Sequence, residues 1–343
     1  MILLLPDQDY SYLSPPKHSS HIIMPLRPFV LICTFTTAFA NAQPTVYPER
    51  SVRVVIPFPA GGPPDILARA LAEPFREKFR QVLVVDNRPG ASGNVGSEIV
   101  AKAAPDGYHL LIAPDTVITV NPHVMKNAAF DARKDLVPLT LLTRISQMLL
   151  CHGSVPAKNV RELVALAGTN ALNYASGGAG APNHLAMELF LFHTGVKMRH
   201  IPYKGAAPVL QDLLAGHVHC AFLGTPAVIA HIKSGRVNAI AISSTIRSPM
   251  APNVPTVAEA GFKDYDVTFY QVLAAPRSLS EPLKRTLAAF ANDVLATSEL
   301  QERTLTPMDH ARVGGSPTDA VNTLADISAK WEKVVKRIGL TFE

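Results

Sequence analysis

Strand-like and helix-like segments alternate along most of this chain, and that alternation limits the possible folds more than any other feature. Short apolar runs rich in β-branched residues are followed by stretches with apolar residues at helical spacing. We expect strands over 52–56, 82–85, 109–113, 148–151, 172–174, 200–203, 218–223 and 237–242, with helices over 66–79, 96–104, 160–167, 184–193, 206–215 and 227–233. Strands joined by helices of this length predict crossover connections, so we expect an α/β fold with mostly parallel sheets flanked by helices.

The end of the chain has a different pattern. Two helical stretches, 281–296 and 318–338, follow one another without a strand pattern between them. A closing helical pair of this kind often packs back on the first domain, and the length suits two domains. We therefore predict a discontinuous domain one, residues 43–145 plus 270–343, which carries the C-terminal helices. Domain two, residues 146–269, would be inserted into it.

The beginning of the chain carries an export signal pattern. Arg27 precedes an uncharged run over 29–40, and Ala40-Asn41-Ala42 has the small residues that a signal peptidase accepts. We interpret residues 24–42 as a signal peptide cleaved near Ala42, and expect a periplasmic mature chain. Residues 1–23 fit neither a signal nor a domain, so we interpret them as a misassigned start that precedes Met24.

Composition narrows the functional classes. With 48% hydrophobic and 17% charged residues the chain is an ordinary globular protein, and it has no Lys/Arg run interleaved with aromatic residues. We therefore predict no nucleic-acid partner. Of the three cysteines, Cys33 leaves with the signal. Cys151 and Cys220 form either one disulfide or two separate buried thiols, because the sequence does not show whether they meet.

A glycine-rich turn follows the first strand. It reads Pro57-Phe58-Pro59-Ala60-Gly61-Gly62-Pro63-Pro64-Asp65 and leads into a helix. Glycines let a ligand approach the backbone closely, prolines suit the first helical turn, and an acidic residue there complements the helix dipole. This turn is either one wall of an anion site or a tight strand–helix connection without a ligand.

A second glycine-rich turn follows the strand at 172–174. Ala175-Ser176-Gly177-Gly178-Ala179-Gly180-Ala181-Pro182 combines several backbone N–H donors with one hydroxyl. Ser176 could bind a carboxylate oxygen or only cap the helix. Two such turns, more than a hundred residues apart in sequence, predict one anionic ligand held from two sides.

Other motifs carry less chemistry. The cluster from Asp86 to Gly96 has glycines at the wrong intervals for a dinucleotide site, so we interpret it as a structural turn braced by Arg88. His217 and His219 lack further metal-ligand residues nearby, and the adjacent Cys151 and His152 would point to opposite faces of a strand. We predict no catalytic residue, no metal and no cofactor.

Several motifs together resemble one family. They are P-F-P-A-G-G-x-x-D-I-L-A-R at 57–69, D-N-R-x-G-A-x-G-x-x-G at 86–96, A-x-P-D-G-Y at 103–108, Y-A-S-G-G-x-G-x-x-x-H-L at 174–185, I-P-Y-K-G-A-A-P at 201–208, D-L-L-A-G at 212–216 and V-P-T-V-A-E-A-G at 254–261. In this order they are similar to the Bug (TctC) family, the extracytoplasmic solute receptors of tripartite tricarboxylate transporters. The resemblance covers essentially the whole mature chain.

The resemblance implies a two-domain periplasmic-binding-protein type II fold that closes on a small carboxylate. Its ligand would lie between the domains and be held by the two glycine-rich turns. Carried over by position, the ligand-binding residues are Phe58, Ala60, Gly61, Gly62 and Asp65 of the first turn, Asp115 and Thr116, Ser176, Gly177, Gly178 and Gly180 of the second turn, Tyr203, Gly205 and Ala206, and the weaker candidates Thr225 and Gln271.

The resemblance also implies partners. The chain would deliver its ligand, as a monomer, to the membrane permease subunits of a tripartite tricarboxylate transporter. Two alternatives stay open: a carboxylate sensor for a signalling partner, and an exported carboxylate-processing enzyme, which would need Asp115 and His184 within hydrogen-bond reach in the cleft. Pro64, His219 and Tyr270-Gln271-Val272 depart from the family pattern, so the family does not identify the ligand.

Overall fold

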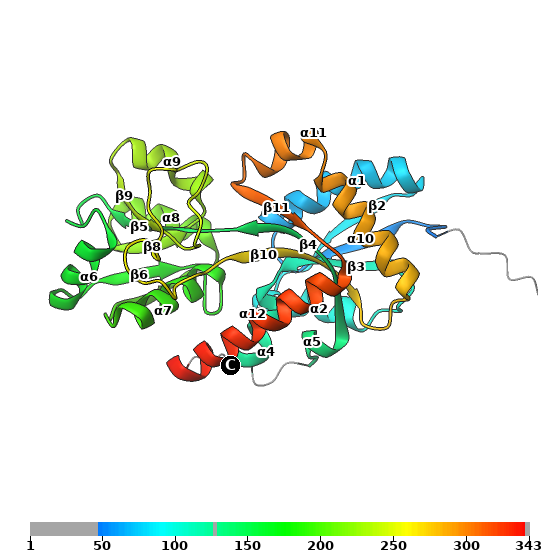
Figure 1. Ribbon diagram of the computed structural model, residues 1–343, viewed down its shortest axis with the longest axis horizontal. Coiled ribbons are helices and arrows are strands. Elements are labelled where there is room, and N and C mark those ends of the chain that lie inside the picture. The colour runs from blue at the N-terminus through cyan, green and yellow to red at the C-terminus, as the bar shows by residue number, and fades with distance from the viewer. Residues whose placement is uncertain (1–46, 126–128, 340–343) are drawn as a thin grey trace, which may run out of the picture. The chain divides into compact units, whose positions relative to one another are not determined.

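Two mixed β-sheets organise the residues that the computed structural model describes, 47–125 and 129–339 (Figure 1). The first sheet has the strand order β11-β4-β10-β3-β1-β2. Its strands are β1 (Val52–Ile56), β2 (Leu83–Asn87), β3 (His109–Pro114), β4 (Leu136–Ile145), β10 (Phe269–Pro276) and β11 (His310–Gly314). The second sheet has the order β7-β6-β8-β5-β9. Its strands are β5 (Met148–His152), β6 (Asn173–Ser176), β7 (Arg199–Pro202), β8 (Cys220–Leu223) and β9 (Val237–Ile242).

Helices connect these strands and follow them. Those nearest the first sheet in sequence are α1 (Pro63–Phe79), η1 (Ala91–Gly93), α2 (Asn94–Ala101), α3 (Thr116–Thr119), α4 (Asn121–Val124), α5 (Ala132–Asp135), α10 (Glu281–Leu295), α11 (Ser298–Leu300), the π-helical η2 (Gln301–Leu305) and α12 (Pro317–Ile338). The second sheet is connected by α6 (Val160–Thr169), α7 (Pro182–Thr194), α8 (Ala206–Ala215) and α9 (Thr225–Lys233). The eight predicted strands are confirmed, but β4 and β10 of the first sheet were not predicted.

Apolar clusters cover both faces of each sheet. On β1, Val54 and Ile56 join the cluster that includes α1 and α10, whereas Val55 joins the one that includes α2 and α12. On β5, Leu149 packs with residues of α6 and α7, and Leu150 packs with residues of α8 and α9. Successive side chains of a strand point to opposite faces, so strands buried on both faces read as continuous apolar runs.

The expectation of mostly parallel sheets is wrong, although the α/β class is confirmed. In the first sheet β10 runs antiparallel to both β3 and β4, and in the second sheet β5 runs antiparallel to both β8 and β9. Only residues 146 and 147 separate β4 from β5, so the chain passes from one sheet into the other without a crossover helix. A strand that arrives in this way is reversed relative to its new neighbours.

The C-terminal helices pack on the first sheet, as predicted. Both α10 and α12 contact β4, and α12 also contacts α7. The expectation that no strand lies between them is wrong, because β11 pairs antiparallel with β4. Its sequence, His-Ala-Arg-Val-Gly, has two exposed residues in the middle and ends at a glycine, so it does not show the alternation of a half-buried strand.

The two remaining cysteines form a disulfide. Cys151 on β5 lies directly opposite Cys220 on β8, and both side chains are fully buried. This decides between the two alternatives that the sequence left open.

The signal-peptide and start-site predictions concern residues 1–42, which lie outside the described residues. The division into domains at residues 145 and 269 stays a prediction. No helix among the described residues has the length and apolar character needed to cross a membrane.

Candidate functional site

The first glycine-rich turn joins β1 to α1 and is held by Asp65. One carboxylate oxygen of Asp65, Oδ2, accepts the N–H of Gly61 at 2.9 Å and Nε of Arg69 at 3.0 Å. The side chain is 2% exposed, and its hydrogen bond from Arg69 contributes most to lowering its pKa. Gly61 has a φ of 82°, which favours glycine. Asp65 therefore fixes the turn and occupies one of its donors, and its contact with the ligand stays a prediction.

Two donors of this turn stay available to a ligand. No acceptor for the N–H groups of Ala60 and Gly62 is found among the described residues, and Gly62 is the N-cap of α1 without a side-chain hydrogen bond. Ala60 is exposed, and an added Cβ at Gly61 would meet nothing within 4 Å. The surface of the turn is therefore open to a small anion, which the start of a helix favours.

The second glycine-rich turn is closed by side chains of its own surroundings. The N–H groups of Gly177 and Gly180 donate to Asn183 Oδ1 at 3.0 Å and to His184 Nδ1 at 3.2 Å, both on the first turn of α7. The N–H of Gly178 donates to Ser176 Oγ at 3.2 Å. In this conformation the three glycine donors are thus satisfied within the protein.

Ser176 faces inwards, where three stacked rings support the turn. Its side chain is fully buried, and Oγ lies 2.7 Å from His200 Nε2. The rings of His184 and His200 stack with centroids 4.2 Å apart, and Tyr174 stacks on His200 at 4.9 Å. Burial lowers the pKa of His184 from 6.5 to about 3 and also lowers the pKa of His200. A neutral His184 ring can accept the Gly180 N–H, whereas a protonated ring cannot.

The loop between β7 and α8 lies directly against the second turn. The N–H of Tyr203 donates to Ser176 O at 2.8 Å, and that of Gly205 donates to Gly177 O at 3.1 Å. A Cβ on Gly177 would lie 3.2 Å from the Gly205 carbonyl carbon, so the two backbones pack closely. Gly205 and Ala206 are exposed, and the Tyr203 hydroxyl donates to Asp212. These predicted residues form one surface with the second turn.

Asp115 and Thr116 lie at the end of β3. Asp115 is fully buried, its Oδ1 accepts the N–H of Tyr270 at 2.9 Å, and its Oδ2 accepts the Thr119 hydroxyl at 3.2 Å. Burial raises the pKa of Asp115 to about 7. Asp115 therefore links β3 to β10, while His184 supports the second turn.

Thr225 and Gln271 are buried polar residues with unpaired oxygens. Thr225 begins α9 and is fully buried, and Gln271 on β10 is 3% exposed. Within the described part of the chain, Thr225 Oγ1 and Gln271 Oε1 have no hydrogen-bond partner. An unpaired buried polar atom costs stability, so such atoms are strong candidates for contact with a ligand or water.

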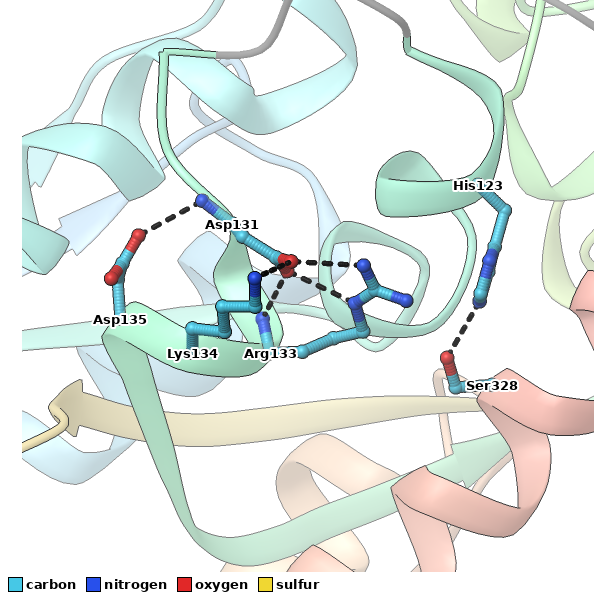
Figure 2. A network of polar contacts seen from close by, with 6 residues as sticks. All are labelled: His123, Asp131, Arg133, Lys134, Asp135 and Ser328. Carbon is cyan, nitrogen blue, oxygen red and sulfur yellow. Dashed lines mark hydrogen bonds and ion pairs between the residues drawn. The ribbon is translucent and has the colours of Figure 1, made fainter.

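Two cavities are lined by other residues. One of about 290 Å³ is open to solvent and is lined mainly by α12, β4 and the short helices α3 to α5. Figure 2 shows the polar network at its edge, in which the Asp131 carboxylate accepts two hydrogen bonds from the Arg133 side chain and His123 Nε2 lies 2.8 Å from Ser328 Oγ. The other, of about 200 Å³, is lined by residues at the end of β4, after β9 and at the start of β10. Neither cavity includes a predicted ligand-binding residue.

Sequence reasoning did not assign Asn183, His184 and His200 to the site. Their signal was available in part, because Asn183 and His184 stand in the first turn of a helix that follows a glycine-rich turn. The described residues contain no group of three or more histidine, cysteine or acidic side chains that could hold a metal ion.

Comparison with known proteins gives a consistent result. The family of tripartite tricarboxylate transporter receptors matches residues 67–340. The periplasmic binding protein BugD is 32% identical, with a TM-score of 0.76 over 87% of this chain and 100% of that one. Rpa4515 of R. palustris, solved with adipate, is 32% identical with a TM-score of 0.78, covering 86% of this chain and 99% of that one. MatC from Rhodopseudomonas palustris, solved with bound malate, is 29% identical with a TM-score of 0.74, covering 84% and 100%.

Proposed function

Because the chain belongs to the tripartite tricarboxylate transporter receptor family, we propose that it is a periplasmic receptor for a small carboxylate rather than an enzyme. The likeness to two proteins solved with adipate and with malate, over at least 84% of this chain, carries the proposal. The bound ligand is delivered by a monomeric receptor to the membrane permease subunits of a tripartite transporter.

We assign the ligand carboxylate to neutral donors. Ala60 and Gly62 present N–H groups at the start of α1, and Ala206 presents one at the start of α8, where no side chain caps the helix. Several such N–H groups near helix starts bind an anion without an arginine. Asp65 does not repel it strongly, because the charge of its carboxylate is compensated by Arg69.

The rest of the ligand contacts the unpaired oxygens. We assign the Thr225 hydroxyl and the Gln271 carbonyl oxygen to this part of the site, because both are buried without a protein partner. The Gln271 oxygen can only accept a hydrogen bond, so a ligand with a hydroxyl or amino group satisfies it better than an unsubstituted dicarboxylate.

The experiment measures the melting temperature of the mature chain, residues 43–343, with a panel of carboxylates that includes malate and adipate. A ligand at a hundred times its dissociation constant stabilises the folded state by about 2.7 kcal/mol, which shifts the melting temperature measurably. No shift with any mono-, di- or tricarboxylate would refute the proposal.

A matched pair of variants locates the site. Thr225→Val removes a hydroxyl without a protein partner, so it should weaken binding about tenfold and leave the free energy of unfolding almost unchanged. Thr140→Val is the control, because that buried hydroxyl donates to Asn292 Oδ1 at 2.8 Å. It should lower stability and leave the affinity unchanged. If Thr225→Val bound the ligand as tightly as Thr140→Val, Thr225 would not be part of the site.

Transport is tested separately. A strain that lacks the gene should lose uptake of the ligand identified by the binding panel and regain it with the wild-type chain. Normal uptake without the gene would favour the signalling alternative.

A further inference from the structure

The loop from Gly90 to Asn94, interpreted from sequence as a structural turn, has an unusual backbone. Four successive residues have positive φ: 146° at Gly90, 46° at Ala91, 51° at Ser92 and 93° at Gly93. The left-handed conformation costs an L-residue with a Cβ about 1–2 kcal/mol, so Ala91 and Ser92 are both strained. Such strain persists only where the surroundings hold the backbone in place, and it is common at ligand-binding sites.

Three contacts hold this loop. The Gly93 N–H donates to Gly90 O at 2.9 Å, and Nδ2 of Asn121 donates to Ser92 O at 3.1 Å. Gly93 also lies against the first glycine-rich turn, since a Cβ there would be 3.0 Å from the ring of Phe58. The strained loop is therefore fixed against a residue predicted to contact the ligand.

The same loop reaches the second glycine-rich turn. The Ser92 hydroxyl donates to Ala179 O at 3.4 Å, across 87 residues of sequence. Ser92 belongs to the connection that follows β2 of the first sheet, and Ala179 belongs to the turn that follows β6 of the second. Phe58, Gly93, Ser92 and Ala179 thus form a continuous path from one turn to the other. Ser92 is half-buried, so the hydroxyl is accessible to a small molecule.

We propose that residues 90–94 form a third wall of the carboxylate site and that the Ser92 hydroxyl is a ligand-binding donor at the point where the two sheets' loops meet. This inference rests on the proposed function. A carboxylate is a stronger acceptor than the neutral Ala179 carbonyl, so a bound ligand takes the Ser92 hydrogen bond. The strained backbone keeps the hydroxyl directed at the opposite turn before the ligand arrives, which reduces the ordering cost of binding.

The test compares two variants of Ser92. Ser92→Ala removes the donor and keeps the strain, whereas Ser92→Gly removes both and so does not harm folding. Calorimetric titration with malate and adipate should show a five- to fifty-fold weaker affinity in both variants. The control is Ser234→Ala, because that exposed hydroxyl also donates to a backbone carbonyl, His231 O at 3.1 Å, but within its own helix. Wild-type affinity in both Ser92 variants would overturn the inference.

A second measurement separates this inference from the proposed function. Amide hydrogen exchange over residues 178–181, without ligand, should be faster in Ser92→Ala than in the wild type or in Ser234→Ala. If the wild type binds no carboxylate, the proposed function fails and the ligand-binding role of Ser92 fails with it. The exchange data then test only the hydrogen bond from Ser92 to Ala179: faster exchange in Ser92→Ala supports this contact, and unchanged exchange overturns it.

Discussion

Replacing Cys151 and Cys220 together by alanine tests how much the disulfide stabilises the second sheet. The two cysteines are 69 residues apart in sequence and lie on neighbouring strands, β5 and β8. Closing a loop of this length removes about 15 cal/mol/K of entropy from the unfolded chain, which corresponds to about 4 kcal/mol at 25 °C. The double variant should therefore lose roughly 4 kcal/mol of unfolding free energy.

The packing of the sulfur atoms adds a separate effect. Both side chains are fully buried, so each truncation to alanine also leaves a small void. The single variant Cys151→Ala loses the disulfide but only one sulfur, and its difference from the double variant measures the packing of Cys220. Each of the two sulfur atoms contributes one such packing loss. Subtracting that difference twice from the unfolding free energy lost by the double variant leaves the effect of the cross-link.

Urea unfolding of the mature chain, followed by circular dichroism, gives these free energies. Residues 43–343 contain no cysteine other than this pair, so a thiol titration of the unfolded chain reports directly on the bond. If the double variant lost less than about 1 kcal/mol of unfolding free energy relative to the oxidised wild type, the loop-entropy argument would be refuted. Two titratable thiols in the wild type would refute the disulfide itself.

Three further predictions concern burial. Folding lowers the pKa of His184 from 6.5 to about 3, so between these pH values the unfolded chain is protonated at His184 and the folded chain is not. The free energy of unfolding should therefore fall by about 1.4 kcal/mol per pH unit below pH 6.5. His184→Gln should reduce that slope in urea titrations at acid pH. For Asp115 the pH dependence has the opposite sign, because folding raises the pKa of its carboxyl from 3.8 to about 7 and the folded state is therefore destabilised as the pH rises through this range. Asp115→Asn should melt at a higher temperature than the wild type at pH 8 but not at pH 4. Gly96→Ala places a Cβ 2.8 Å from Arg88 O and should cost about 1–3 kcal/mol in urea unfolding, unlike Gly168→Ala, which meets nothing within 4 Å.

Eight of the eleven strands could be predicted because they are short and mostly apolar, whereas β4, β10 and β11 were missed. In the run Val52–Ile56, Val52, Val54 and Ile56 join one core and Val55 joins another, so Arg53 is the single polar interruption of an otherwise apolar pattern. Strand direction could not be predicted, because it depends on which sheet a strand joins. The reversed strands β5 and β10 are mostly buried, like the parallel strands β1 and β3, and β11 pairs through its backbone although Ala311 and Arg312 are exposed.

The glycine-rich turns were predictable as turns, but their free donors were not. The family resemblance places Gly61, Gly177 and Gly180 among the ligand-binding residues. In the structure the Gly61 donor is occupied by Asp65, and the Gly177 and Gly180 donors by Asn183 and His184. Whether a side chain folds back on its own turn depends on rotamers and packing that the local sequence does not specify.

The same reasoning explains why the loop at 90–94 was undervalued. Glycine at positions 90 and 93 is expected in a turn, but nothing in the letters Ala-Ser between them indicates left-handed backbone, which these residues rarely adopt. Phe58 lies against Gly93, and Asn121 donates to Ser92 O; these two residues are 35 positions before and 28 positions after Gly93, so no local sequence pattern indicates that they hold the loop. A loop that folding forces into this shape holds Ser92 at a fixed distance from the second turn. The proposed site therefore has three loops rather than two, and the Ser92 variants are the test that would separate ligand binding from folding.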